Sequence, residues 1–515
     1  MRPRWRVGSV AVALSLIAAS VVPAYAHGFG ERYDLPLPLW MYLIGAGAAV
    51  AFSFVIIGLL LRNTPGLHGY ARLNLLQWPA GRLLVHPATL LLVKVASALA
   101  FLLVIAAGVY GVQNPNENLA PTMVWVIWWV GLAYVSALVG NLWALLNPWK
   151  IIFSWKERLF RWVNPEGTLS FNLPYPRWLG VWPGVALFLG FAWVETVFPG
   201  SARPLNLGLL AVGYSLITWA GMVLFGKHVW LGHGEAFSIA FAFLARFAPT
   251  EVRVVDSRTC EQCSIACQDK AGECVDCYEG FDVAEAGRRE VNLRPFAAGL
   301  LRDDERHLSQ VAFVLLMLAT VTFDGFTATP TWASLVSASS PFVSAYTEQA
   351  GAVVASIGLA LFPLIFAALY IYFAILMALS AQARGKIGTV VSAFAYSLIP
   401  IALAYHLAHF LSFLLIQGQL VIPLASDPLG YGWDVLGTAD YRINIAIVNA
   451  RFAWFSAVFA IVVGHIIAVY LSHIVAMRTF GNHRLALRSQ YPMLVLMVGY
   501  TVISLWILAQ PITEV

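Results

Sequence analysis

The chain has 515 residues and a net charge of +5, with 60% hydrophobic and only 11% charged side chains. Soluble domains carry about 25% charged residues, so this composition excludes an ordinary water-soluble protein and indicates the lipid bilayer as the main surrounding. The basic residues are scattered over short loops and form no stripe or recognition module, so we expect no nucleic-acid partner.

Residues 1–26 have the pattern of a signal peptide. Three arginines among the first six residues precede an apolar stretch over 10–19 and an A-x-A motif that ends at Ala26. Cleavage after this motif would make His27 the first residue of the mature chain. An uncleaved first helix is the alternative, but the apolar stretch is short for a membrane span.

The mature chain, residues 27–515, contains ten stretches of the length that a transmembrane helix needs, which is about 20 mostly apolar residues. The sequence therefore predicts an all-α fold, a polytopic membrane bundle of about ten transmembrane helices. The stretches are 38–61, 88–111, 121–146, 178–198, 205–226, 308–328, 351–380, 388–419, 448–476 and 491–510.

Lys and Arg are distributed unevenly between alternate loops of this bundle. Apart from the three arginines of the signal peptide and Lys94 within a span, 23 of 27 basic residues fall in loops on one side. The other side holds four, which are Arg32, Arg203, Arg442 and Arg451. Basic loops stay in the cytoplasm, so the pattern predicts a multi-pass inner-membrane protein with both termini on the outer side.

The longest cytoplasmic connection lies between the fifth and sixth spans. Its apolar segment over 235–247 is expected to be an interfacial helix. A cysteine-rich loop follows over 250–295, and the five cysteines of the chain fall within 18 residues of it. Their spacing is C-x2-C-x3-C-x6-C-x2-C, and they are Cys260, Cys263, Cys267, Cys274 and Cys277.

Two C-x2-C pairs can supply four thiolates to one tetrahedral zinc ion. We therefore predict a structural zinc site formed by Cys260, Cys263, Cys274 and Cys277, in a reducing compartment where disulfides rarely persist. Because Cys267 adds a fifth thiol, an iron–sulfur cluster is the second interpretation. A reduced loop without metal is the third.

Histidines inside the apolar spans form a second group of interest. His406 and His409 lie three residues apart and so share one face of the eighth span. His465 lies at a similar depth in the ninth span, so the three imidazoles could together bind a metal ion or a haem. Hydrogen bonds between the helices are the alternative role for them.

The turn-rich loop over 421–449 lies on the outer side, near these histidines. Its carboxylates, Asp427 and Asp434 among them, could complete a divalent metal site that activates water. Glu195 and Asp324 also lie near outer helix ends. Turn formation is the competing account of the loop aspartates. At the mature N-terminus, His27 offers an amine and an imidazole to a metal such as copper.

Three segments resemble bacterial membrane proteins known as fenitrothion hydrolases. They are the mature start HGFGERYDLPLPLW, the loop SDPLGYGWDVLGTADYR and the ending QYPMLVLMVGYTVISLWILAQPI, and the similarity spans essentially the whole mature chain. The resemblance implies hydrolysis of an organophosphorus triester, which releases a nitrophenol and a dialkyl thiophosphate. It implies no role for any particular residue.

These observations lead to one expected function and one alternative. The expected function is a membrane-embedded, metal-assisted hydrolase of apolar organophosphorus triesters with an outward-facing site, in which His406, His409, Asp427 and Asp434 are catalytic. The alternative is a membrane transporter, or a metal- or haem-handling protein, that uses the intramembrane histidines. The sequence indicates neither the natural substrate nor the oligomeric state.

Overall fold

The computed structural model describes residues 35–61, 70–261, 263, 268, 272, 274–302 and 306–513. The expected signal peptide, the possible ligand His27 and the fifth cysteine, Cys267, lie outside the described residues. Within them, ten helices are long and apolar enough to cross a membrane, as the sequence predicted. Their bounds are Leu39–Leu60, Pro87–Tyr110, Leu119–Leu138, Arg177–Thr196, Pro204–Phe225, Leu308–Thr327, Ala350–Ser380, Arg384–Ser426, Ala450–Phe480 and His483–Gln510.

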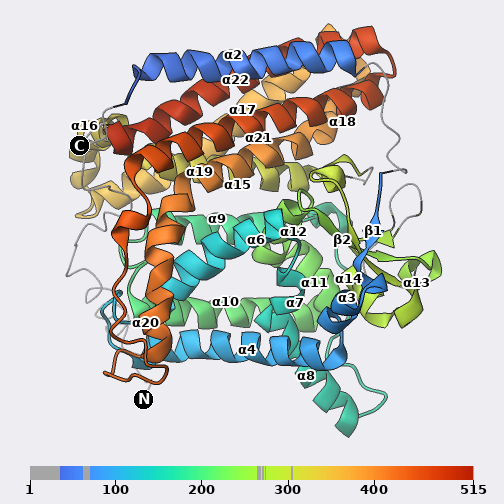
Figure 1. Cartoon of the computed structure of the whole chain (residues 1–515), viewed down its shortest axis with the longest axis vertical. Helices are drawn as coiled ribbons and strands as arrows, with labels where there is room; N and C mark the ends of the chain where they lie inside the picture. Colours follow the sequence, from blue (N-terminus) through green and yellow to red (C-terminus); the bar gives the residue numbers. More distant parts are fainter. Residues whose placement is uncertain are drawn as a thin grey trace, which may run out of the picture.

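The long helices run across Figure 1 and form two groups, one above the other. The upper group consists of α2 (Leu39–Leu60), α15 (Leu308–Thr327), α17 (Ala350–Ser380), α19 (Ile399–Gln417), α21 (Ala450–Phe480) and α22 (His483–Thr513). The lower group consists of α4 (Pro87–Tyr110), α6 (Leu132–Leu138), α9 (Trp182–Thr196) and α10 (Pro204–Phe225). The groups meet where α15 packs against both α9 and α19.

Two of the spans are interrupted rather than continuous α-helices. The third span begins with α5 (Leu119–Pro121), continues as a π-helix, η4 (Thr122–Gly131), and ends with α6. The eighth span joins α18 (Ile387–Phe394), α19 and α20 (Val421–Ser426) through the 3-10 turns η9 (Ala395–Leu398) and η10 (Gly418–Leu420). Such interruptions in membrane helices are frequent at functional sites.

The segment expected to be an interfacial helix is instead buried inside the bundle. It forms α12 (Ala236–Ala245), which follows α11 (Lys227–His233) and packs against α6, α9 and α19. The sequence of α12, AFSIAFAFLA, has no polar face, and its Ala236, Ala240 and Phe241 are fully buried. An interfacial helix needs one polar and one apolar face, so the expectation was wrong for a physical reason.

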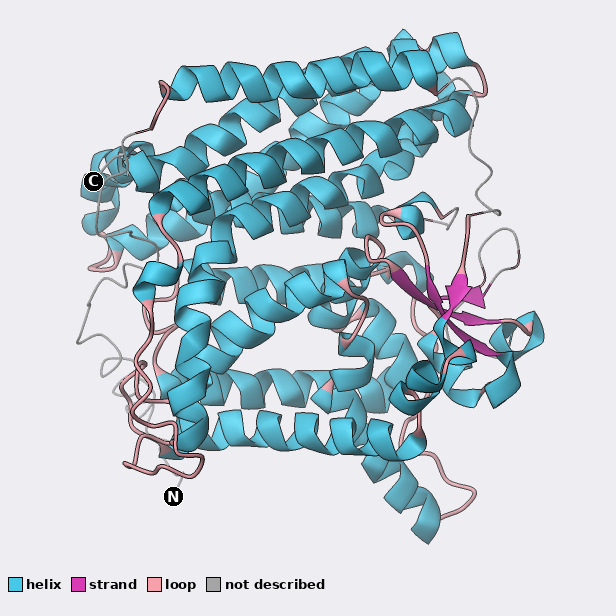
Figure 2. Ribbon diagram, in the orientation of Figure 1, coloured by secondary structure: helices cyan, strands magenta, loops and turns pink. Residues whose placement is uncertain are grey.

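A small antiparallel sheet lies at one end of the bundle, drawn in magenta in Figure 2. Its order is β1-β4-β2-β3, and Val252 of β2 pairs with Val291 of β4. Because β1 comes from the connection between the first two spans, the sheet ties that connection to the cysteine-rich loop. The strands are β1 (Leu73–Asn74), β2 (Thr250–Val254), β3 (Cys274–Val275) and β4 (Arg289–Leu293).

Shorter helices connect and cover the spans. The α-helices among them are α3 (Pro79–Leu84), α7 (Trp143–Leu146), α8 (Pro148–Val163), α13 (Ser257–Glu261), α14 (Tyr278–Val283) and α16 (Pro330–Ser344). The 3-10 turns are η3 (Leu75–Gln77), η5 (Arg177–Leu179), η6 (Ala286–Arg288), η7 (Ala298–Leu301), η8 (Arg384–Lys386) and η11 (Ile445–Ile447).

The two ends of the bundle differ in character. We call the end that carries β1–β4 the sheet end, and the end that carries residues 427–449 the loop end (Figure 1). The described chain both starts and finishes at the loop end, as an even number of spans requires.

Candidate functional site

A small cavity lies where the two groups of helices meet. Its volume is about 30 Å³, enough for one or two water molecules or for an ion. Its wall is mostly apolar, but it also carries three ionisable side chains from three helices. These are Glu195 on α9, Asp324 on α15 and His406 on α19.

Asp324 is paired with one of the predicted histidines. The Nε2 atom of His409 lies 2.8 Å from Oδ2 of Asp324, and both side chains are largely buried. The two residues come from α15 and α19, which pack together. Ionisable groups inside a membrane protein are costly unless they pair in this way, and they mark ion or substrate sites by default.

Glu195 is held by a tryptophan of the π-helix. The indole Nε1 of Trp129 donates a hydrogen bond of 2.7 Å to Oε1 of Glu195. The π-helical winding of Thr122–Gly131 determines which residues of this span face the cavity, and Trp129 is one of them.

Both carboxylates lie in the last turn of their helices. Glu195 precedes the final residue of α9, and Asp324 lies three residues before the end of α15. The C-terminal end of a helix carries a partial negative charge, which disfavours a carboxylate and favours a cation. Desolvation and mutual repulsion add to this effect, so the two groups need a proton or another cation near them.

His406 has ring nitrogens that are available to bind a proton or a metal ion. Only 8% of the residue is exposed, and neither ring nitrogen has a hydrogen-bond partner among the described residues. Its ring lies edge-on to Trp129 and Tyr134, at centroid distances of 5.7 and 5.5 Å. An imidazole without a partner that shares a cavity with two carboxylates can accept a proton or bind a metal ion.

The loop aspartates occupy a different environment. Asp427 accepts hydrogen bonds from the amides of Tyr431 and Gly432, at 2.9 and 2.6 Å. Asp434 accepts one from the amide of Ala439, and this bond holds the pKa of Asp434 below its usual value. Neither aspartate lines the cavity. Their contacts are those of turn-forming residues.

His465 also lies apart from the cavity wall. Its ring is fully buried, and Nδ1 lies 2.8 Å from the carbonyl oxygen of Ile461, one turn earlier in α21. Tyr500 of α22 is its aromatic neighbour, at a centroid distance of 5.8 Å. Of the three imidazoles, His406 therefore lines the cavity, His409 contacts the cavity residue Asp324, and His465 lies apart from both.

From the sequence, Glu195 and Asp324 were identified only as residues near helix ends and not as members of a site. An ionisable side chain within an apolar span was the available signal, and it was as strong for them as for the histidines. Trp129 carried no such signal, because one tryptophan in a tryptophan-rich span does not stand out.

A second cluster of possible ligands lies at the sheet end. Cys260 of α13, Cys274 of β3 and Cys277 have sulfur atoms within 4.8 Å of one another, and all three residues are buried. Among the described residues, this is the one group of three metal-ligating residue types that converges so closely. Cys263 completes it, with its sulfur 3.6 Å from that of Cys277.

Gly280 lies directly beside these sulfur atoms, at a position that leaves no room for a side chain. A Cβ atom on Gly280 would lie 2.8 Å from the sulfur of Cys260, 3.2 Å from that of Cys277 and 3.4 Å from that of Cys263. The amide of Gly280 also donates to the sulfur of Cys277, at 3.4 Å. Only a residue without a side chain leaves room for this arrangement.

The four cysteines that the spacing selected therefore lie together. A zinc–sulfur distance of about 2.3 Å places the sulfurs of a tetrahedral site about 3.8 Å apart, close to the observed separation of Cys263 and Cys277. The structure joins Cys260 and Cys274 by a disulfide, so binding of a metal by all four requires this bond to be reduced.

No family model matches the chain, and no curated protein or solved structure is significantly similar to it.

Proposed function

We propose that the chain is a membrane transporter for a divalent transition-metal ion, and that Glu195, Asp324, His406 and His409 form its intramembrane ion site. One observation carries the proposal. Two carboxylates at helix C-termini and the imidazole of His406 line one small cavity in the bundle, and His409 pairs with one of these carboxylates. Carboxylate and imidazole groups are suitable ligands for manganese, iron and zinc ions.

The surrounding architecture supports this proposal. Ion sites of many transporters are formed by interrupted helices whose C-terminal ends face the ion. Here the π-helix η4 and the interrupted eighth span both contribute to the cavity wall, through Trp129 and His406. Such sites commonly lie between two groups of helices that move against each other, which is the location of this cavity.

The Asp324–His409 pair supports coupling of metal transport to the movement of protons in the opposite direction. In the described residues these side chains pair with each other, and their ligand atoms do not converge with those of Glu195 and His406 as a preformed metal site. Metal ligands must be deprotonated, so metal binding releases protons from the imidazoles and carboxylates. The proposed reaction is therefore exchange of a metal ion for protons.

Manganese uptake by proteoliposomes tests the proposal. Mn²⁺ prefers oxygen and imidazole ligands over thiolates, so the cysteine cluster contributes little to the signal. We expect uptake by the wild-type protein, with protons moving in the opposite direction. The Asp324→Asn variant should lower uptake about 100-fold or more, because it removes an ion ligand and the partner of His409.

The control for this experiment is Asp440→Asn, which changes a carboxylate of the exposed loop outside the cavity wall. It should transport like the wild type. Equal uptake by the Asp324→Asn variant and the wild type would contradict the proposal. So would failure of the wild-type protein to move any divalent transition-metal ion above the rate of protein-free vesicles.

Hydrolysis of an organophosphorus triester is the second candidate. It is supported by the resemblance of three segments and by the Asp324–His409 pair, which could act as a general base on a water molecule in the cavity. Pockets for organic ligands measure about 300–1,000 Å³, far more than this cavity, so the substrate would require an open state.

Nitrophenol release by purified protein, with and without a chelator, tests the hydrolase. We expect His409→Ala to abolish release and Asp434→Asn to retain it, because only His409 belongs to the pair at the cavity. Equal release by both variants and by the wild type would place the chemistry elsewhere.

We also propose that the protein lies in the inner membrane, with the sheet end in the cytoplasm and both mature termini on the outer side. The excess of basic residues in alternate loops supports this orientation. Reporter fusions after Asp427 and after Gly287 should report the outer side and the cytoplasm, respectively. If both fusions report the same side, the orientation is wrong.

A further inference from the structure

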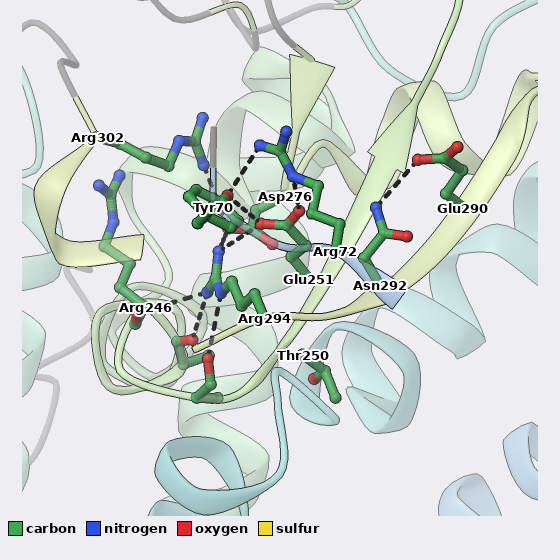
Figure 3. A network of polar contacts seen from close by, with 12 residues as sticks. Tyr70, Arg72, Arg246, Thr250, Glu251, Asp276, Glu290, Asn292, Arg294 and Arg302 are labelled. Carbon is green, nitrogen blue, oxygen red and sulfur yellow. Dashed lines mark hydrogen bonds and ion pairs between the residues drawn. The ribbon is translucent and has the colours of Figure 1, made fainter. Parts of the chain in front are cut away.

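Asp276 of the cysteine-rich loop belongs to a network of ion pairs with Arg294 and Arg302 (Figure 3). From it we infer that Cys260, Cys263, Cys274 and Cys277 bind a zinc ion that controls the cavity, with Asp276 as the residue that transmits the effect. The consequence for transport rests on the proposed ion site. The coupling itself concerns only the conformation of α12 and can be measured without transport.

The first link is Asp276, which lies between two of the cysteines in the sequence. It follows β3 and has a left-handed backbone conformation, with φ of +58°. Its amide donates to the carbonyl oxygen of Val252 in the neighbouring strand, at 2.7 Å. A metal ion held by Cys274 and Cys277 would therefore fix the backbone on both sides of Asp276, and with it the position of the carboxylate.

The second link is the pair of arginines that this carboxylate contacts. Oδ2 of Asp276 lies 3.6 Å from Nη1 of Arg294 and 3.2 Å from Nη1 of Arg302. The side chain of Arg294 is fully buried, and that of Arg302 is nearly so. Solvent and salt screen a buried charge pair only weakly. A displacement of the carboxylate would therefore change its interaction energy with both arginines strongly.

The third link joins Arg294 to the cavity wall. Its guanidinium donates to the carbonyl oxygens of Ala245, Arg246 and Ala248, at 3.2–3.4 Å (Figure 3). These carbonyls belong to the C-terminal end of α12, where a cation both caps the helix and interacts favourably with its dipole. Leu244, the residue before the capped end, lines the cavity.

A parallel connection runs from Arg302 to the span that carries the histidines. Arg306 donates to the carbonyl of Arg302, and also to those of Ser392 and Ala393 at the end of α18. The guanidinium carbon atoms of Arg306 and Arg246 lie 4.5 and 4.7 Å from the ring centroid of Tyr396 in η9. The end of α12 is thus held by Arg294, which contacts Asp276, and the segment before α19 is held by Arg306, which contacts the backbone of Arg302.

Zinc binding should accordingly hold α12 in its capped position, and loss of zinc should release it. Coupling between two sites needs a structural element whose conformation is affected by both of them. Helix α12 meets this condition, because its end is bound by Arg294 and its side lines the cavity. A metal site that served only to fold its own loop would leave α12 unaffected.

Hydrogen–deuterium exchange of the α12 peptide tests the inference. The full chain is purified in detergent with a phosphine reductant and measured with one equivalent of zinc and with a chelator. We expect about one zinc per chain, and removal of zinc should accelerate exchange in α12 about tenfold, a typical size for coupling between two sites. The Asp276→Asn variant should bind zinc normally, but exchange in α12 should no longer respond to zinc.

Asn tolerates the left-handed conformation at position 276, so this variant removes the charge without straining the backbone. Gly280→Ala is the second variant, because its Cβ collides with the sulfurs and should weaken zinc binding. Gly287→Ala, where a Cβ meets nothing within 4 Å, is the matched control and should behave like the wild type.

Two results would overturn the inference. Absence of zinc from the reduced wild-type protein would remove the metal site. Stoichiometric zinc with unchanged exchange in α12 would show that the site is structural only. Because neither measurement involves transport, failure of manganese uptake leaves this test intact. Conversely, zinc could change the exchange rate of α12 without changing the rate of manganese uptake. That result would confirm the coupling and overturn its consequence for transport.

Discussion

Replacing Arg294 by methionine is expected to destabilise the protein by about 3–5 kcal/mol, the usual cost of removing one partner from a buried ion pair. Only 4% of Arg294 and 2% of Glu251 are exposed, and Nη1 of Arg294 lies 2.9 Å from Oε2 of Glu251. The variant would leave this carboxylate with Arg72 and Tyr70 as its polar partners. It would also leave the end of α12 without its cap.

The pKa of Arg294 also indicates that the folded state is stabilised by its charge. Burial lowers the pKa of the Arg294 guanidinium, but the carboxylates of Asp276 and Glu251 outweigh burial, and the net effect is a raised pKa. The folded state therefore favours the charged arginine, which stays protonated at all pH values relevant to the cell. The predicted loss of stability should hence not depend on pH near neutrality.

Thermal unfolding of detergent-purified protein, followed by size-exclusion chromatography, measures this effect. The control is Arg288→Met, which removes a half-exposed arginine paired with Asp256 and should cost less than about 1 kcal/mol. The double variant Arg294→Met with Glu251→Met should recover part of the loss, because it removes the buried carboxylate that has lost one of its two arginine partners. Equal melting of Arg294→Met and Arg288→Met would mean that this ion pair does not stabilise the sheet end.

Replacing Gly464 by alanine is the second change with a large expected effect. A Cβ at this position of α21 would collide with the Cβ of Ala404 and would lie 2.8 Å from the carbonyl oxygen of Pro400, both on α19. Membrane helices associate through such close contacts at small residues. We expect a loss of about 1–3 kcal/mol, as for other overpacked interiors, and a sharp loss of manganese uptake.

The reason for the loss of uptake is the position of the clash. Ala404 precedes His406 by two residues, so moving α19 away from α21 would displace both imidazoles of the ion site. Gly499→Ala on α22 is the matched control, because its Cβ would meet nothing within 4 Å. Adding Ala404→Gly to Gly464→Ala should restore part of the stability. Wild-type melting and uptake by Gly464→Ala would contradict this account of the packing.

Several features of the protein follow from the sequence alone, because each is a property of a single segment. Length and apolar character identify a membrane span without reference to its neighbours, so the ten spans were predicted correctly. Helical periodicity brings His406 and His409 to the same face of one helix. Two C-x2-C pairs separated by a short spacer can approach each other locally, and their four sulfurs do so.

The sheet and the position of α12 depended on distant partners instead. β1 pairs with β4, although more than 200 residues separate Leu73 from Leu293. The cap on α12 comes from Arg294, whose role cannot be seen until β2 and β4 are paired. An apolar ten-residue helix is compatible with burial or with an interface, and only its neighbours decide between them.

Tertiary structure likewise determined which residues form the proposed ion site. Asp324 meets His409 across 85 residues, whereas Asp427, which is much closer in sequence, bonds within its own turn. In a membrane bundle, the lipid-facing and protein-facing sides of a helix are equally apolar, so hydropathy does not reveal which faces pack together. The sequence by itself thus determined which segments cross the membrane and where ionisable groups lie along them. Only helix packing determined that Glu195 and Asp324, rather than the loop aspartates, share the cavity with His406.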